Sequence, residues 1–222
     1  MKPRISLIIP DLHNKVDFAQ RCINAVPDAD EVIFLGDFFD DYFDDPVDAM
    51  RMAKYLKTIL HKPNYHFCWG NHDLPYGFPT NNHLSCPGFT EDKLKAIRNF
   101  LSPADWSVFK LVHKTQGFYL SHAGIVEKLF SHPMKGVTHK VIMDECKKAL
   151  QQARDGVFSH ILSTGESRGG SKGWAGGITW ADWSELTPIK GISQILGHTP
   201  NREVRENHSV SSKNFCIDCN GT

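Results

Sequence analysis

Short apolar runs alternate with amphipathic segments along the first half of this chain. Five runs across the whole sequence are rich in β-branched or aromatic side chains, a composition that predicts buried strands. They occupy residues 5–9, 32–35, 65–69, 118–120 and 192–196. Between the first three runs, residues 16–26 and 46–61 place apolar side chains at helical spacing. This strand and helix order predicts right-handed parallel crossovers and an α/β fold.

The pattern changes after residue 74. Residues 74–103 are rich in Pro, Gly and Asn around a short predicted helix near 91–100, and we expect this excursion to cap the carboxyl ends of the strands. Residues 108–112 and 118–121 flank Gln116-Gly117, which predicts a hairpin.

The second half favours a different arrangement. Residues 138–154 predict a long helix, whereas residues 163–177 contain six Gly and predict a mobile loop rather than a folded element. From about Val108 we expect more antiparallel pairing. The predicted fold is therefore a four-layer α/β/β/α sandwich of two mixed sheets flanked by helices, in one domain spanning residues 1–222.

Composition narrows the possible functions. The 222-residue chain is 41% hydrophobic, enough for a substantial core, and its 25 Lys plus Arg balance its 25 Asp plus Glu. Charge therefore gives no reason to expect nucleic-acid binding. Six Cys are spread along the chain, and the apolar stretch at residues 5–10 is too short for a signal peptide or a membrane span. We expect a cytoplasmic protein that does not engage a membrane.

A polar cluster directly follows each predicted strand. The clusters are Asp11-Leu12-His13, Gly36-Asp37-Phe38-Phe39-Asp40, Gly70-Asn71-His72-Asp73, Ser121-His122-Ala123-Gly124 and Gly197-His198-Thr199. Ligands of α/β sheets bind at the carboxyl ends of strands, so the five clusters are expected to meet. Several of the 12 His residues of the chain lie inside them, which indicates a metal site.

The types of side chain in these clusters indicate which residues would bind each of two metal ions. A carboxylate bridges two ions only from a central position, and Asp37 is the candidate. Asp11 and His13 point to the same side of an extended segment and are assigned to the first ion. The second ion is completed by Asn71, His122 and His198.

A site with two such ions indicates that the protein hydrolyses a phosphoester. They share a water molecule and lower its pKa, so that a bridging hydroxide attacks phosphorus in line. His72, beside Asn71, is placed to protonate the leaving oxygen, and Asp40 is placed to accept the other imidazole N–H. We therefore assign His72 and Asp40 to the catalytic step.

Together these motifs resemble the calcineurin-like metallophosphoesterase superfamily, and within it the small bacterial and phage members of the phosphoprotein phosphatase branch. The resemblance covers residues 7–218, with all five motifs in order, and includes residues 179–182 and 215–218. It implies the four-layer sandwich, two divalent ions with Mn²⁺ as the first expectation and Fe or Zn as alternatives, and hydrolysis of a phosphorylated substrate, either a phosphoprotein or a small phosphoester. It implies the same metal ligands and the same roles for His72 and Asp40.

The sequence also departs from that branch, and alternatives stay open. Asp41-Tyr42 stands where the branch has Arg-Gly, so its phosphate-gripping arginine is missing, and Arg98, Arg168 or Arg202 are the possible substitutes. Thr199-Pro200 stands where many phosphodiesterases of the superfamily end in a second His, which favours monoesters. Hydrolysis of dinucleoside polyphosphates or phosphodiesters remains the alternative. A non-catalytic scaffold is disfavoured because every expected ligand is present.

Other polar features receive no role. The acidic run after Asp40 is interpreted as a solvated loop, and the Cys216 and Cys219 pair as a chance spacing. Eight further histidines are left unassigned, namely His61, His66, His83, His113, His132, His139, His160 and His208.

Overall fold

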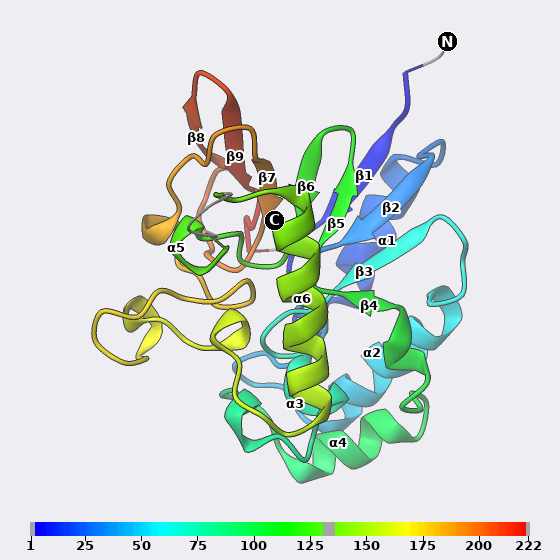
Figure 1. The fold of residues 1–222 in the computed structure, drawn as a ribbon. Helices are drawn as coiled ribbons and strands as arrows, with labels where there is room; N and C mark the ends of the chain where they lie inside the picture. The colour runs from blue at the N-terminus through cyan, green and yellow to red at the C-terminus, as the bar shows by residue number, and fades with distance from the viewer. Residues whose placement is uncertain (1–2, 131–135, 221–222) are drawn as a thin grey trace.

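The computed structural model describes residues 3–130 and 136–220. It contains two β-sheets with helices on their outer faces (Figure 1). Besides the elements bounded below, short helices are α3 (Leu74–Gly77), α5 (Glu127–Phe130), η1 (Asn82–Leu84), η2 (Asp105–Val108), η3 (His160–Leu162), η4 (Glu166–Arg168) and η5 (Trp183–Glu185). No helix within this described part of the chain has the length and apolar character needed to cross a bilayer.

The first sheet is parallel throughout its described strands. Its order is β1 (Ser6–Ile9), β2 (Glu31–Phe34), β3 (Tyr65–Cys68) and β4 (Phe109–Lys110). The first three strands follow the predicted apolar runs closely. Parallel pairing places all their carboxyl ends at one edge, so the polar clusters that follow them are brought together.

The second sheet is mixed. Its order is β5 (His113–Thr115), β6 (Phe118–Leu120), β7 (Ser193–Leu196), β9 (Ser212–Cys216) and β8 (Arg205–Ser209). The β5–β6 and β8–β9 pairs are antiparallel, whereas β7 runs parallel to both β6 and β9. Strands β6 and β7 therefore end at the same edge, and the clusters that follow them lie next to each other.

Alternating side chains of the central strands separate the layers. Ile33, Leu35 and Leu120 form a buried cluster between the two sheets, with Ile8 and Ile195 packed against it. The opposite face of β6 carries Tyr119, whose hydroxyl lies 3.2 Å from Nδ1 of His139 at the start of α6. One face of each strand thus meets the other sheet, while the other face meets helices.

Helices complete the outer layers. On the first sheet lie α1 (Val16–Ala25) and α2 (Pro46–Ile59), α4 (Glu91–Arg98) packs against α2, and α6 (His139–Arg154) covers the second sheet (Figure 1). Local sequence sets their starts, because Thr90 and Thr138 cap α4 and α6 through side-chain oxygens. Asp45 and Asp48 form a reciprocal capping box in front of α2. The four-layer α/β/β/α fold class is confirmed.

Two expectations about the second half were wrong in detail. The predicted hairpin is present, but its first strand is β5 (His113–Thr115) and not residues 108–112. Within 108–112, Phe109 and Lys110 instead pair with β3 in the first sheet. The chain therefore changes sheets between Lys110 and His113, and alternation of side chains alone does not reveal such a change.

The glycine-rich segment 163–177 is folded, contrary to the expectation of a loop without regular structure. It contains η4, and its two ends are tied by the hydrogen bond from Gly177 N to Ser163 O at 2.9 Å. An added Cβ at Gly165, Gly170 or Gly176 would collide with backbone atoms. These glycines allow close backbone packing, which explains why their density does not mark an unstructured loop.

Candidate metal centre

The eight side chains singled out by the sequence form one connected cluster beyond the carboxyl ends of β1, β2, β3, β6 and β7. Each of them lies against at least one other member or against the loop that carries it. They are Asp11, His13, Asp37, Asp40, Asn71, His72, His122 and His198. The fold thus brings together residues that are up to 187 positions apart in sequence.

His122 stands at the centre of the cluster and is fully buried. Its Nδ1 lies 3.1 Å from the carbonyl of Leu35, which fixes the ring and directs Nε2 toward the other candidate ligands. Nε2 lies 2.8 Å from Asn71 Oδ1, 3.0 Å from His198 Nδ1 and 3.2 Å from Asp37 Oδ2. One atom of each of Asp37, His122 and His198 falls within 4.8 Å of the other two.

The donor atoms around His122 fit a cation. When Nδ1 donates to Leu35, the neutral ring presents a lone pair at Nε2, and this lone pair faces the oxygens of Asn71 and Asp37. Several acceptors directed at the same space repel one another unless a proton or a metal ion lies among them. His198 adds a buried Nε2 for which the described residues offer no hydrogen-bond partner. Carboxylate, amide oxygen and imidazole are suitable ligands for Mn, Fe or Zn.

His13 and Asp11 also border the cluster. Nδ1 of His13 lies 2.5 Å from the carbonyl of Asp40, so Nε2 is left toward Asp37, 3.8 Å from its Oδ2. The Asp11 carboxylate accepts the backbone N–H of His198 at 2.7 Å and 3.0 Å and lies 3.7 Å from Nδ1 of His122. These two side chains are therefore further candidate ligands next to the group around His122.

The backbone of the cluster is held in conformations that most residues avoid. His13, Asp37, Asp40 and His198 have φ values of 42°, 51°, 63° and 69°. Left-handed conformations at non-glycine residues carry a conformational cost of order 1–3 kcal/mol each, and surrounding structure must offset it. Among the described residues, four of the seven non-glycine residues with positive φ belong to the candidate site.

Close approach of two loops depends on glycine. A Cβ at Gly70 would collide with the backbone N and the Oδ1 atom of Asp37, and a Cβ at Gly36 would collide with the backbone of Gly70. This approach lets Asp37 Oδ1 accept the N–H of His72 at 3.0 Å. The glycines that precede the motif residues therefore position the central carboxylate.

Asp73 is a buried support that the sequence analysis left without a role. Its two oxygens accept the backbone N–H groups of Asp37, Phe38 and Gly70 at 2.8–2.9 Å. Because burial and the charge of Asp37 both act on it, the pKa of Asp73 is raised to about 7. Its position directly after His72 was the available signal, but a single turn residue does not reveal that it anchors a neighbouring loop.

The carboxylate of Asp40 binds three side chains. Oδ2 lies 3.2 Å from Nδ1 of His72, while Oδ1 accepts the hydroxyl of Tyr76 at 2.6 Å and the ammonium of Lys93 at 3.1 Å. Lys93 is 5% exposed and also binds Asp44 Oδ1 at 2.5 Å. The acidic run after Asp40 is consequently not a wholly solvated loop, because Asp44 is buried by this contact.

Opposing charges set the protonation of the cluster. Burial lowers the pKa of His72, but the charge of Asp37 and the hydrogen bond to Asp40 outweigh it and raise this pKa to about 12. In the same way, Asp37 and Asp11 overcome the burial of His122 and raise its pKa to about 9. Burial raises the pKa of Asp37, but the charges of His122 and His72 outweigh burial and lower this pKa below its usual value, so that the carboxyl stays ionised. Without metal, the negative charge of the carboxylates thus favours protonated rings at His72 and His122.

Among the three candidate arginines, Arg168 lies next to a motif. Its Nη2 lies 3.0 Å from both Thr199 Oγ1 and Asp182 Oδ2. Its charge also contributes to the low pKa of His198, after burial and the charge of His122. Arg98 and Arg202 are exposed.

Comparison with known proteins identifies a matching family. The profile of the calcineurin-like phosphoesterase domain matches residues 6–202. A protein serine/threonine phosphatase from Saccharomyces cerevisiae has a similar structure, with a TM-score of 0.51, 14% identity, and coverage of 99% of this chain and 69% of the yeast chain. A metallophosphoesterase from Sphaerobacter thermophilus aligns with a TM-score of 0.44 and 14% identity, with coverage of 96% of this chain and 76% of that chain. A search of curated protein sequences gives no significant match.

Proposed function

Because this chain belongs to the calcineurin-like phosphoesterase family and is thus a metal-dependent hydrolase of phosphoester bonds, we propose that it cleaves phosphate monoesters, as serine/threonine phosphatases do. The convergence of Asp37, Asn71, His122 and His198 on one buried point carries the proposal. Such convergence has no purpose in a scaffold that only binds a partner, since these polar groups are costly to bury without a cation.

The residues that would hold two divalent ions follow from the contacts. Asp11, His13 and Asp37 would hold one ion, and Asp37, Asn71, His122 and His198 the other. When bound, such ions supply positive charge that lowers the pKa of water and stabilises the charge on a phosphoryl group in the transition state. The protein fixes the ring of His122 through the Leu35 carbonyl and the ring of His13 through the Asp40 carbonyl.

His72 would protonate the leaving oxygen. Its Nδ1 is held by Asp40, so Nε2 is the nitrogen left to donate a proton. The ring lies edge-on to His13, with 5.3 Å between centroids, which places it beside the first candidate ion site. Since its pKa is raised by Asp37 and Asp40 despite burial, His72 carries a proton at neutral pH.

Arg168 would bind the phosphoryl oxygens in place of the missing arginine after Asp40. The observation that favours it is a buried Nε–H that lacks a partner within the described residues, on a guanidinium next to the fifth motif. Although Nη2 pairs with Asp182, this free Nε–H on a cationic group suits a dianionic monoester, which carries more negative charge than a diester. The position of Arg168 is thus the reason to prefer the monoester over the phosphodiester alternative.

Substrate preference tests the proposal. Protein stripped by a chelator and restored with Mn²⁺ is assayed on p-nitrophenyl phosphate, bis(p-nitrophenyl) phosphate and a dinucleoside tetraphosphate. Faster cleavage of the monoester at equal concentration is the expected result, and Asp37→Asn serves as the inactive control. Dominant cleavage of either other substrate would replace the phosphatase proposal with the corresponding alternative.

Three further properties are part of the proposal. We expect Mn²⁺ to restore activity best, with Fe or Zn as alternatives, because oxygen and imidazole ligands suit all three. The substrate would be a phosphoprotein or a small phosphoester, and no nucleic-acid partner is expected from the balanced charge. A cytoplasmic location is proposed because Cys68, Cys86, Cys146 and Cys216 are buried as thiols.

A further inference from the structure

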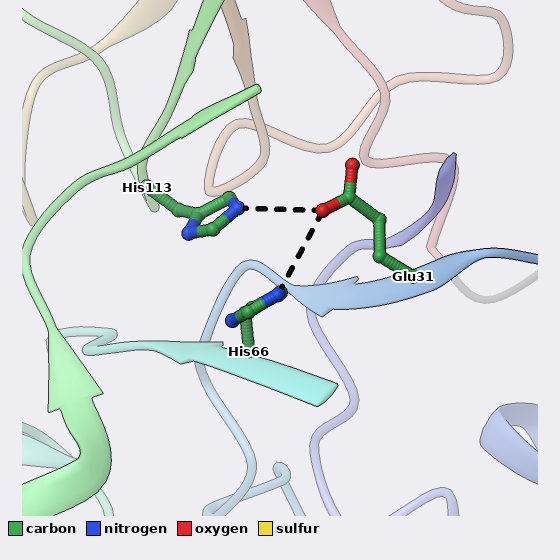
Figure 2. Close-up of side chains that lie close together, drawn as sticks. All are labelled: Glu31, His66 and His113. Carbon is green, nitrogen blue, oxygen red and sulfur yellow. Dashed lines mark ion pairs between the residues drawn. The ribbon is translucent and has the colours of Figure 1, made fainter. Parts of the chain in front are cut away.

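A second group of metal-ligand side chains lies at the opposite end of the strands. Glu31 is the first residue of β2, His66 lies in β3, and His113 is the first residue of β5. Each offers a ligand atom within 4.8 Å of the other two. Figure 2 shows both imidazoles directed at one carboxylate oxygen of Glu31. The candidate catalytic cluster lies beyond the carboxyl ends of β2 and β3, whereas Glu31 begins β2, so the two groups are separate.

The spacing leaves room for an ion. Nε2 of His66 and Nε2 of His113 are each 3.7 Å from Oε2 of Glu31, too far for a hydrogen bond. Ligand atoms bound to zinc at about 2.0–2.2 Å with tetrahedral angles are separated by roughly 3.3–3.5 Å. The two rings stack, with 4.1 Å between their centroids and 20° between their planes. Coordination would therefore need one ring to rotate so that both Nε2 lone pairs meet, together with a contraction of a few tenths of an ångström toward Glu31.

The carboxylate of Glu31 is oriented for this role. Its Oε1 accepts the hydroxyls of Ser6 and Thr115, both at 2.5 Å, and its Oε2 accepts the Arg4 guanidinium at 2.9 Å. A carboxylate has about four lone-pair sites, so one site on Oε2 remains for the side that faces the imidazoles. The Glu31 side chain is only 2% exposed, which keeps the geometry fixed.

Both imidazoles turn Nε2 toward the Glu31 carboxylate, and neither nitrogen is close enough to form a hydrogen bond with it. Nε2 of His113 is buried and finds no hydrogen-bond partner among the residues described.

We propose that Glu31, His66 and His113 bind a zinc ion that ties the first sheet to the second. Two imidazole nitrogens and one carboxylate oxygen are a ligand set typical of zinc, and a fourth position remains for water. Glu31 and His66 belong to the first sheet, whereas His113 begins the second. The ion binds only the folded chain, so it stabilises that state.

Counting zinc tests the site without relying on activity. Chelator-stripped protein is loaded with Zn²⁺, excess metal is removed, and zinc per chain is measured by elemental analysis. His66→Gln and His113→Gln are compared with wild type and with His208→Gln, a control on the exposed surface of β8. Each site variant is expected to bind one zinc ion fewer than wild type, and the control the same number as wild type.

The difference between variants decides the outcome, whatever total the candidate catalytic centre contributes. Equal zinc content in all four proteins would overturn the proposal. Thermal unfolding gives a second readout, because Zn²⁺ should raise the midpoint of His208→Gln more than that of either site variant. Two independent site variants guard against one that folds poorly, and midpoints in chelator identify such a case. An equal zinc-induced rise in all variants would also contradict the site.

Discussion

The contact of Lys93 with Asp40 and Asp44 makes a sharp quantitative prediction. The ammonium is 5% exposed and has three oxygen partners, at 3.1 Å on Asp40, 2.5 Å on Asp44 and 2.9 Å on the Gly88 carbonyl. Lys93→Met keeps the length of the side chain but removes the cation of buried Asp44 and leaves Asp40 with His72 as its charged partner. Breaking a buried ion pair by removing one partner costs about 3–5 kcal/mol. We expect the free energy of unfolding to fall by that amount.

The same helix supplies a matched control. Lys95 pairs with Asp92, and both side chains are 74% exposed, so Lys95→Met should leave the free energy of unfolding nearly unchanged. Urea unfolding of both variants at neutral pH measures the difference. Adding Asp44→Asn to Lys93→Met should recover part of the loss, because one stranded charge is removed. Equal stabilities of Lys93→Met and Lys95→Met would refute the account.

Three other substitutions test separate parts of the structure. Burial raises the pKa of Asp105, but its bonds with Lys57 and Ser102 outweigh burial and lower this pKa from 3.8 to about 2. The stabilisation that comes from this shift is present above pH 3.8 and is lost as the pH falls toward 2. As the pH falls over that range, the free energy of unfolding of Asp105→Asn should therefore decrease by about 1–2 kcal/mol less than that of the wild type, as measured by unfolding at each pH. Gly70→Ala should abolish Mn²⁺ binding at the candidate catalytic centre in calorimetric titration, because its Cβ would collide with Asp37, whereas Gly117→Ala, with open space around it, should bind normally. Arg168→Met should raise KM for p-nitrophenyl phosphate roughly 10–100-fold, the equivalent of one charged hydrogen bond, and exposed Arg202→Met should leave steady-state KM unchanged.

The sequence was most informative where the same pattern recurs, namely a polar cluster directly after an apolar run. The polar clusters after the apolar runs indicated both the edge of the sheets and the residues gathered there, since parallel strands bring their carboxyl ends together. The long helix predicted over residues 138–154 is present as α6, and the Thr138 side chain that caps it acts on the adjacent turn. These features are local, so the neighbouring residues alone determine them.

Features that depend on distant contacts were missed. Lys93 has the spacing of an ordinary amphipathic helix, and only the fold shows that it faces Asp40 and Asp44. The convergence of Glu31, His66 and His113 requires two sheets to be packed together, and no sequence spacing encodes it. Arg168 reaches Thr199 because the glycine-rich segment is folded, which composition alone had argued against.

Metal content and turnover of two variants, measured side by side, test the central assignment most directly. Asp37→Asn removes the carboxylate shared by both candidate ion sites, and His72→Asn removes the proposed proton donor next to ligand Asn71. The account predicts that Asp37→Asn loses one or both catalytic metals together with activity. It predicts that His72→Asn keeps both metals and loses turnover, most strongly for substrates with poor leaving groups. Equal loss of metal in the two variants, or full metal content in Asp37→Asn, would contradict it.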